Sequence, residues 1–139
     1  MIHFLDASAL VKRYVAEAGT EAIEDLFRSG QPLAISRLSL IEVPSALCRR
    51  ARAGDLSAGD LLLALGDLAR DAEQLLVVEL DAPLTAAATA LLQRHALRAG
   101  DAAQLGAAVM LRQLTGMSVR FHGADQRLAA AAMAEGLSS

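Results

Sequence analysis

Residues 2–10 of this chain read IHFLDASAL, a short apolar run that ends at an aspartate and continues into small residues. The run Ile2–Leu5 predicts a buried strand, and the residues from Ala7 onward predict a helix that follows it directly. Aspartate is disfavoured in strands, and a carboxylate at the margin of an apolar core loses hydration that a donor, a cation or a metal must replace. Asp6 therefore caps the following helix, with Ser8 as a second candidate cap, or it belongs to a charged site.

The rest of the chain repeats this alternation of strand and helix. Further strands are predicted within PLAIS (32–36), LLVVEL (75–80) and SVRFH (118–122), and helices are predicted at 7–15, 20–28, 38–52, 101–114 and after Ser57, Asp81 and Asp125. Such alternation favours a parallel sheet with helices on both faces and right-handed crossovers. We therefore expect one domain over residues 1–139, of α/β class, as a three-layer α/β/α sandwich with a mostly parallel four- or five-stranded sheet.

The composition of the chain restricts its core, its compartment and its mode of binding nucleic acid. The chain has 139 residues, of which 54% are hydrophobic and 3% aromatic, so its core is expected to consist of Ala, Leu and Val. A single cysteine, no apolar run of about 20 residues and no basic N-terminal leader predict a cytoplasmic protein. The net charge of −3 argues against nucleic-acid binding by bulk electrostatics. A bound metal would reverse the sign of the field locally, so an enzyme that acts on nucleic acid is not excluded.

Three further acids lie in apolar surroundings: Glu42 in SLIEVPSAL, Asp101 in LRAGDAAQLGAA and Asp125 in FHGADQRLAAA. Asp6 and Asp125 follow predicted strands, and Glu42 lies early in a helix that follows another, so these three are expected at one edge of the sheet. The position of the Asp101 helix is not fixed by the sequence. Taken singly, Asp101 and Asp125 fit helix N-caps, and Glu42 fits an ordinary exposed helix residue.

Clustered carboxylates repel one another, and a divalent cation relieves that repulsion. Mg²⁺ and Mn²⁺ prefer oxygen ligands and suit phosphodiester hydrolysis by activated water. No competing constellation is evident, because Ser8 lacks a histidine placed to activate it and Cys48 lies within a predicted helix. The three histidines are scattered, which argues against a catalytic triad or a zinc site.

In these four segments the chain resembles PIN-domain proteins, and specifically the VapC toxins of type II toxin–antitoxin pairs. FLDASALVKRYVAEAGT is similar to the first motif of that family and carries Asp6 and Ser8. RLSLIEVPSAL resembles the family segment that carries a glutamate on a helix, and Glu42 stands at that position. LRAGDAAQLGAAVML, which contains Asp101, resembles the family's Asp-Ala opening of a helix of small residues. GADQRLAAAA, which contains Asp125, resembles the family's last acidic motif. The likeness therefore extends from residue 1 to about 137, with the motifs in the family's order.

The resemblance implies a Mg²⁺- or Mn²⁺-dependent endoribonuclease toxin, commonly a homodimer, that a cognate VapB-like antitoxin neutralises in its active-site groove. It implies Asp6 and Asp101 as principal metal ligands, and Glu42 and Asp125 as ligands directly or through water. Ser8 would orient a ligand or the RNA substrate. The alternatives are a catalytically inert PIN-like module that binds RNA or protein, and a phosphoacceptor receiver domain, which lacks the required Asp and Lys at its strands.

The chain departs from the family pattern in two places. Many members have Thr two residues before the last aspartate, where this chain has Gly123, and the missing hydroxyl is expected to weaken the role of Asp125. Many members also end in a fifth strand, whereas AEGLSS predicts an absent or very short one. Basic residues close to the first two motifs are candidates for RNA phosphate contacts or for helix C-terminal charges: Lys12, Arg13, Arg49, Arg50 and Arg52.

Overall fold

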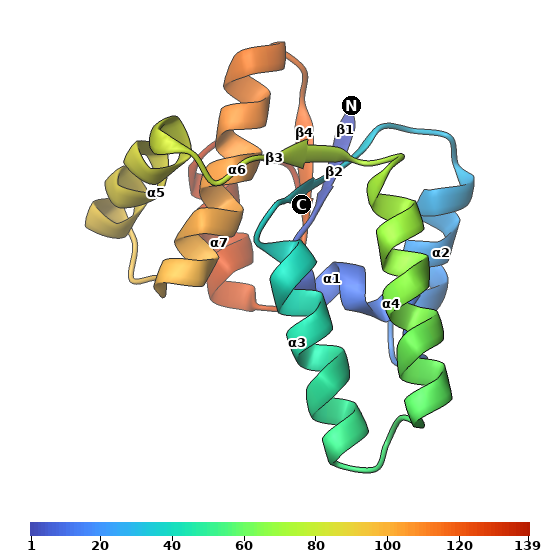
Figure 1. Ribbon diagram of the computed structural model, residues 1–139. Coiled ribbons are helices and arrows are strands. Elements are labelled where there is room, and N and C mark those ends of the chain that lie inside the picture. Colours follow the sequence, from blue (N-terminus) through green and yellow to red (C-terminus); the bar gives the residue numbers. More distant parts are fainter.

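The computed structural model describes all of residues 1–139 and contains a four-stranded sheet (Figure 1). Its strands are β1 (Ile2–Leu5), β2 (Leu33–Ser36), β3 (Leu76–Val78) and β4 (Val119–His122). All pairings are parallel and the order is β3-β2-β1-β4, so the two halves of the chain meet at β1. Leu5 is in register with His122, which places the carboxyl ends of β1 and β4 side by side.

Seven α-helices connect the strands: α1 (Ala7–Leu10), α2 (Thr20–Arg28), α3 (Ser39–Arg52), α4 (Ala58–Ala72), α5 (Ala82–Arg94), α6 (Ala99–Thr115) and α7 (Gln126–Ala134). Helices α1 to α4 supply one core cluster and α5 to α7 supply the other. Along β1 the side chains alternate between these cores, with Phe4 in the second and Leu5 in the first. The α/β/α sandwich predicted from the sequence is therefore confirmed, with four parallel strands.

Local signals fix most helix starts. Ser57 accepts the amide of Asp60, and Asp81 accepts the amide of Leu84 ahead of a helix with Pro83 in its first turn. Pro44 lies in the second turn of α3, which continues to Arg52. In Figure 1, α3 and α4 form a long hairpin that extends beyond the edge of the sheet.

Three local expectations differ from the structure. The helix predicted for 7–15 ends at Leu10 and tightens into a 3₁₀-helix over Val11–Arg13, as helix ends often do. Thr20 begins α2 but does not cap it, because its hydroxyl accepts the amide of Glu17 instead. Asp101 is the third residue of α6, whose N-cap is Arg98, so the capping interpretation of Asp101 is wrong.

The C-terminus adds a remnant of a fifth strand. Ser138 forms a single parallel bridge with Arg120, in which Phe121 N donates to Ser138 O and Ser138 N donates to Val119 O, both at 2.9 Å. The sequence prediction of an absent or very short last strand agrees with this bridge. None of the helices combines the length and the apolar character needed to cross a bilayer.

Candidate active site

A hollow of about 390 Å³ lies beyond the carboxyl ends of β1 and β4. Its wall contains all four acids singled out in the sequence, together with Ser8 and one buried amide side chain: Asp6, Ser8, Glu42, Asp101, Gln104 and Asp125, with Ala7 and Ala124. We call this the acidic hollow. The acids come from four different segments, so only the tertiary fold brings them together. Asp101, whose position the sequence left open, lies with the other three.

Asp6 is the most firmly held of the four. It directly follows β1, caps α1, and is only 5% exposed. Its Oδ1 accepts hydrogen bonds from Ser8 Oγ at 2.7 Å and from the Ala9 amide at 2.9 Å. Ser8 Oγ in turn accepts the amide of Ala124 at 2.9 Å, which joins α1 to the segment between β4 and α7. Ser8 therefore orients Asp6 rather than facing the hollow as a free hydroxyl.

Glu42 and Asp101 come from α3 and α6, which converge above the sheet edge. Gln104 Nε2 donates to Glu42 Oε1 at 3.0 Å and to Ser39 Oγ at 2.9 Å. Gln104 was missed in the sequence, although a polar residue one turn after Asp101 within the apolar AAQLGAAVML helix was a usable signal.

Asp125 is exposed and caps α7, where its Oδ1 accepts the amides of Arg127 at 2.7 Å and Leu128 at 3.2 Å. The capping interpretation of Asp125 is therefore correct. A cap still leaves the second carboxylate oxygen free, and the residue lines the hollow. Both roles are compatible.

The electrostatics of the hollow favour a cation. Burial raises the pKa of Asp6, its hydrogen bonds oppose that rise, and the charge of Asp101 adds to it. The pKa of Asp101 is also raised, first by burial and then by the charge of Asp125, against the charge of Arg98. A cation among these groups would remove both the repulsion and the cost of burial.

The donor set fits a hard divalent ion through one or two carboxylates at a time. No three of the His, Cys, Asp or Glu side chains lie close enough together in this structure to hold one ion. Mg²⁺ commonly keeps several waters and takes only one or two protein carboxylates, so the wider spacing suits it. Asp6 and Asp101, the two carboxylates whose pKa values rise, are the direct candidates.

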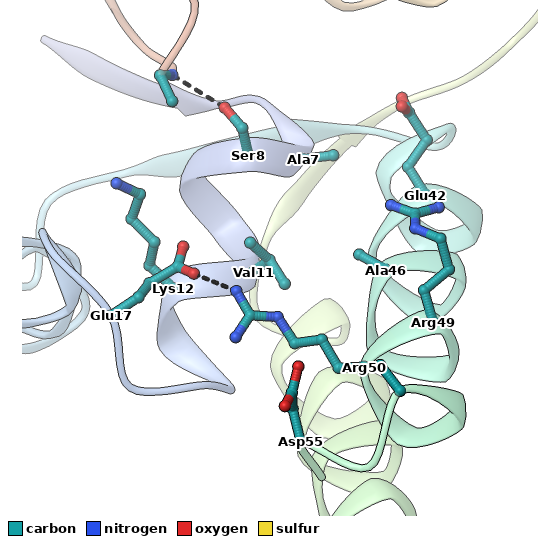
Figure 2. A pocket seen from close by; sticks show the side chains of 12 residues that line it. Ala7, Ser8, Val11, Lys12, Glu17, Glu42, Ala46, Arg49, Arg50 and Asp55 are labelled. Atoms are coloured by element: carbon teal, nitrogen blue, oxygen red, sulfur yellow. Dashed lines mark hydrogen bonds and ion pairs between the residues drawn. The ribbon is translucent and has the colours of Figure 1, made fainter.

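Two wider hollows adjoin the acidic one and share residues with it. The first, of about 600 Å³, runs between α1 and α3, and Figure 2 shows Arg49 extending along α3 toward Glu42. At its far end Arg50 pairs with Glu17, while Lys12 donates to the carbonyl of Ala18 at 2.8 Å. We call this the α3 groove.

The second hollow, of about 620 Å³, lies between α6 and α7 and contains Arg98 and Arg127 beside Asp101 and Asp125. Cations thus lie on both sides of the acids. Arg13 does not contribute, because it binds Glu24 and Asp71 away from the site. The expectation of an RNA contact at Arg13 is not supported by that position.

Comparison with known proteins identifies the family of this fold. The model of the PIN domain family matches residues 3–133, and the chain belongs to that family. It is 36% identical over 110 residues to Ribonuclease VapC45 and to Ribonuclease VapC49 of Mycobacterium tuberculosis, which covers 76% of this chain and 74% of each relative.

Solved structures share the fold at lower identity. The crystal structure of M. tuberculosis VapC20, described as a Sarcin-Ricin loop cleaving toxin, matches with a TM-score of 0.68 and 21% identity over 93% of this chain and 94% of VapC20. VapBC2 from Rickettsia felis, bound to a DNA fragment from the promoter, matches with a TM-score of 0.60 and 13% identity over 90% of this chain and 100% of the matched chain.

Proposed function

We propose that this protein is a metal-dependent endoribonuclease toxin of VapC type. The observation that carries the proposal is the acidic hollow, where four carboxylates from four segments line one space of about 390 Å³ at the carboxyl edge of a parallel sheet. Membership of the PIN family and 36% identity to two VapC ribonucleases support RNA as the substrate.

In this proposal the four acids have two different roles, which follow from how each side chain is held. Asp6, fixed by Ser8 and the Ala9 amide, and Asp101, on the first turn of α6, would hold a Mg²⁺ or Mn²⁺ ion. Glu42 and Asp125 would orient water around it. When bound, such a cation lowers the pKa of water and neutralises charge on the phosphodiester.

The flanking hollows supply the RNA path in this proposal. Arg49 on one side and Arg98 and Arg127 on the other can each contact a phosphate, so a strand crossing the acids is held at both ends. Because acids would repel a phosphate without a cation, binding of RNA at the centre depends on the metal.

The proposal includes a cognate antitoxin, by likeness to the VapBC2 complex, and a homodimeric assembly, by likeness to the family. Co-expression with the product of a neighbouring small reading frame, followed by co-purification, tests the first. Light scattering of the purified protein tests the second.

Cleavage of RNA by purified protein tests the activity itself. We expect cleavage with Mg²⁺ or Mn²⁺ that chelation abolishes and that Asp6→Asn and Asp101→Asn each remove. Asp25→Asn is the matched control, since Asp25 is an exposed acid on α2 that pairs only with Arg28. Activity that survives chelation and both substitutions would exclude the metal-dependent mechanism, and an absence of cleavage by the wild type with either ion would favour the inert binding module.

A further inference from the structure

Gln104 is a buried amide in the wall of the acidic hollow, and it belongs to neither hydrophobic core. It is 3% exposed and lies one turn after Asp101 on α6. Its side chain reaches α3, where it contacts Ser39 and Glu42. It thereby connects the helix that carries Asp101 to the helix that carries Glu42.

We propose that Gln104 is a positioning residue of the metal site, which holds Glu42 in a fixed relation to Asp101. The inference rests on the proposed function, because it assigns a role toward the same cation. Glu42 Oε1 accepts a hydrogen bond from the Gln104 amide, and Glu42 Oε2 lies 4.0 Å from where a β-carbon on Gly100 would stand. Both carboxylate oxygens of Glu42 are thus directed at the first turns of α6.

The orientation of the amide is determined by its partners. Gln104 Nε2 has two protons, and both are used, one by Ser39 Oγ and one by the Glu42 carboxylate. A flipped amide would place its oxygen against the Glu42 carboxylate, where two acceptors repel. The nitrogen must therefore face Glu42, and the oxygen must point the other way.

That orientation leaves Gln104 Oε1 buried without a hydrogen-bond partner. An unpaired buried acceptor destabilises the folded chain, and native proteins keep few of them. An apolar side chain of similar size would fill the same space without this cost. The oxygen of the amide is therefore unfavourable for folding, and the benefit of the side chain lies in the hydrogen bond that its nitrogen donates to Glu42.

Second-sphere hydrogen bonds of this kind orient metal-binding carboxylates, and their loss typically lowers metal affinity about 10- to 100-fold. In the absence of Gln104, Glu42 would rotate freely at the start of α3. The cation would then lose a carboxylate at a defined distance from Asp101. Folding would change less, because loss of the amide removes the unpaired Oε1 but also leaves the buried Ser39 hydroxyl without its donor.

The test combines metal binding, stability and cleavage in full-length protein. Mn²⁺ binding is measured by calorimetry, thermal unfolding is measured with chelator present, and RNA cleavage is measured as kcat and KM. For Gln104→Leu we expect Mn²⁺ affinity about 10- to 100-fold weaker and a fall in kcat with KM little changed. The melting temperature should stay close to that of the wild type, because the unpaired Oε1 is removed while the Ser39 hydroxyl loses its donor. Gln113→Leu is the matched control, because Gln113 is exposed on the same helix, and we expect no change in Mn²⁺ affinity.

A double-mutant cycle separates action through Glu42 from an independent effect. If Gln104 acts by holding Glu42, Gln104→Leu has no further effect on Mn²⁺ affinity once Glu42→Gln is present. Equal Mn²⁺ binding by Gln104→Leu and wild type, or fully additive losses in the cycle, would overturn the inference. A wild type that binds no Mn²⁺ overturns the proposed function as well, and that result is distinguishable because it appears before any substitution.

Discussion

The two sides of the acidic hollow are built differently. On the β1 side, Asp6 is buried and receives a backbone amide and a hydroxyl, and that hydroxyl is itself fixed by the amide of Ala124. On the helical side, Glu42 is held by one side-chain amide, and Asp101 lies in the first turn of a helix that has no side-chain cap. The strand side is held by backbone amides and a hydroxyl, whereas the helical side is held by a single side-chain hydrogen bond.

This difference indicates which part of the site is preformed. Hydrogen bonds to a carboxylate offset the cost of burying its charge, so Asp6 keeps one geometry with or without a ligand. Glu42 and Asp101 are less buried and can adjust when a cation arrives. A rigid ligand opposite adjustable ones suits a site that must accept a metal and a phosphate in turn.

The largest effect is expected from exchanging a carboxylate for an amide on each side. Asp6→Asn should lower RNA cleavage by about 100-fold or more, because a direct ligand is worth more than the 10- to 100-fold of an outer-sphere partner. Glu42→Gln should lower it by about 10-fold, since water can replace an adjustable ligand. Single-turnover cleavage at saturating Mn²⁺ measures both, and equal losses would remove the distinction between the sides.

A second comparison uses one glycine from each side. A β-carbon on Gly123 would overlap Asp6 Oδ2 and lie 2.9 Å from Asp6 Cγ, whereas one on Gly100 would lie 4.0 Å from Glu42 Oε2. Neither glycine has a positive φ, so backbone strain does not decide the effect of either substitution. Gly123→Ala should destabilise the protein by about 1–3 kcal/mol or displace Asp6 and impair cleavage.

Gly100→Ala should be neutral or stabilise α6 by about 0.5–1 kcal/mol. Chemical denaturation and cleavage assays measure both variants.

The absence of Thr at position 123 thus makes room for Asp6 here, and Gly123→Thr should impair the enzyme. Increased activity of Gly123→Thr would favour the interpretation based on the missing hydroxyl.

Low pH should lower the stability of the fold on the strand side of the acidic hollow, because it protonates His122. The ring of His122 lies 2.9 Å, nitrogen to nitrogen, from that of His3, and burial, His3 and Arg120 lower its pKa from 6.5 to about 4. The folded state binds this proton less tightly than the unfolded chain does. The stability that neutral His122 contributes is therefore present above pH 6.5 and is lost as the pH falls toward about 4.

We expect a loss of about 1–2 kcal/mol in the free energy of unfolding over that range, a value discounted for the partial exposure of the ring. Denaturant titrations at several pH values measure it. His122→Gln should remove this part of the pH dependence, and a wild-type stability that is flat from pH 6.5 to 4 would contradict the assignment.

The smallest effect is expected at the α3 groove. Arg49 bonds only Ser45 of its own helix at 3.0 Å and is free to meet a phosphate. Arg49→Ala should raise KM for RNA a few-fold and lower the salt dependence of binding by about one phosphate contact. Arg28→Ala on α2, remote from the hollow, is the control and should leave both unchanged.

Much of the fold was readable from the sequence because it depends on local patterns. Apolar runs marked all four strands, and the starts of α4, α5 and α7 followed from their caps. The range of α2 was also predicted, although Thr20 does not cap that helix. Asp6 follows β1 directly and Asp125 comes three residues after the end of β4, so the parallel topology alone brought these two acids to one edge. The alternative interpretation of Asp101 as a helix cap was wrong, because α6 begins two residues earlier, at Ala99, and its N-cap is Arg98.

The sequence by itself determined the strand and helix order, the sheet class and the identity of the acids, since periodicity and capping act over a few residues. Only the tertiary structure decided that Asp101 joins the hollow, that Gln104 holds Glu42, and that Gly123 leaves room for Asp6. The Gln104–Glu42 and Ala124–Ser8 hydrogen bonds join residues 62 and 116 positions apart. They depend on how side chains pack between layers, which no local pattern in the sequence encodes.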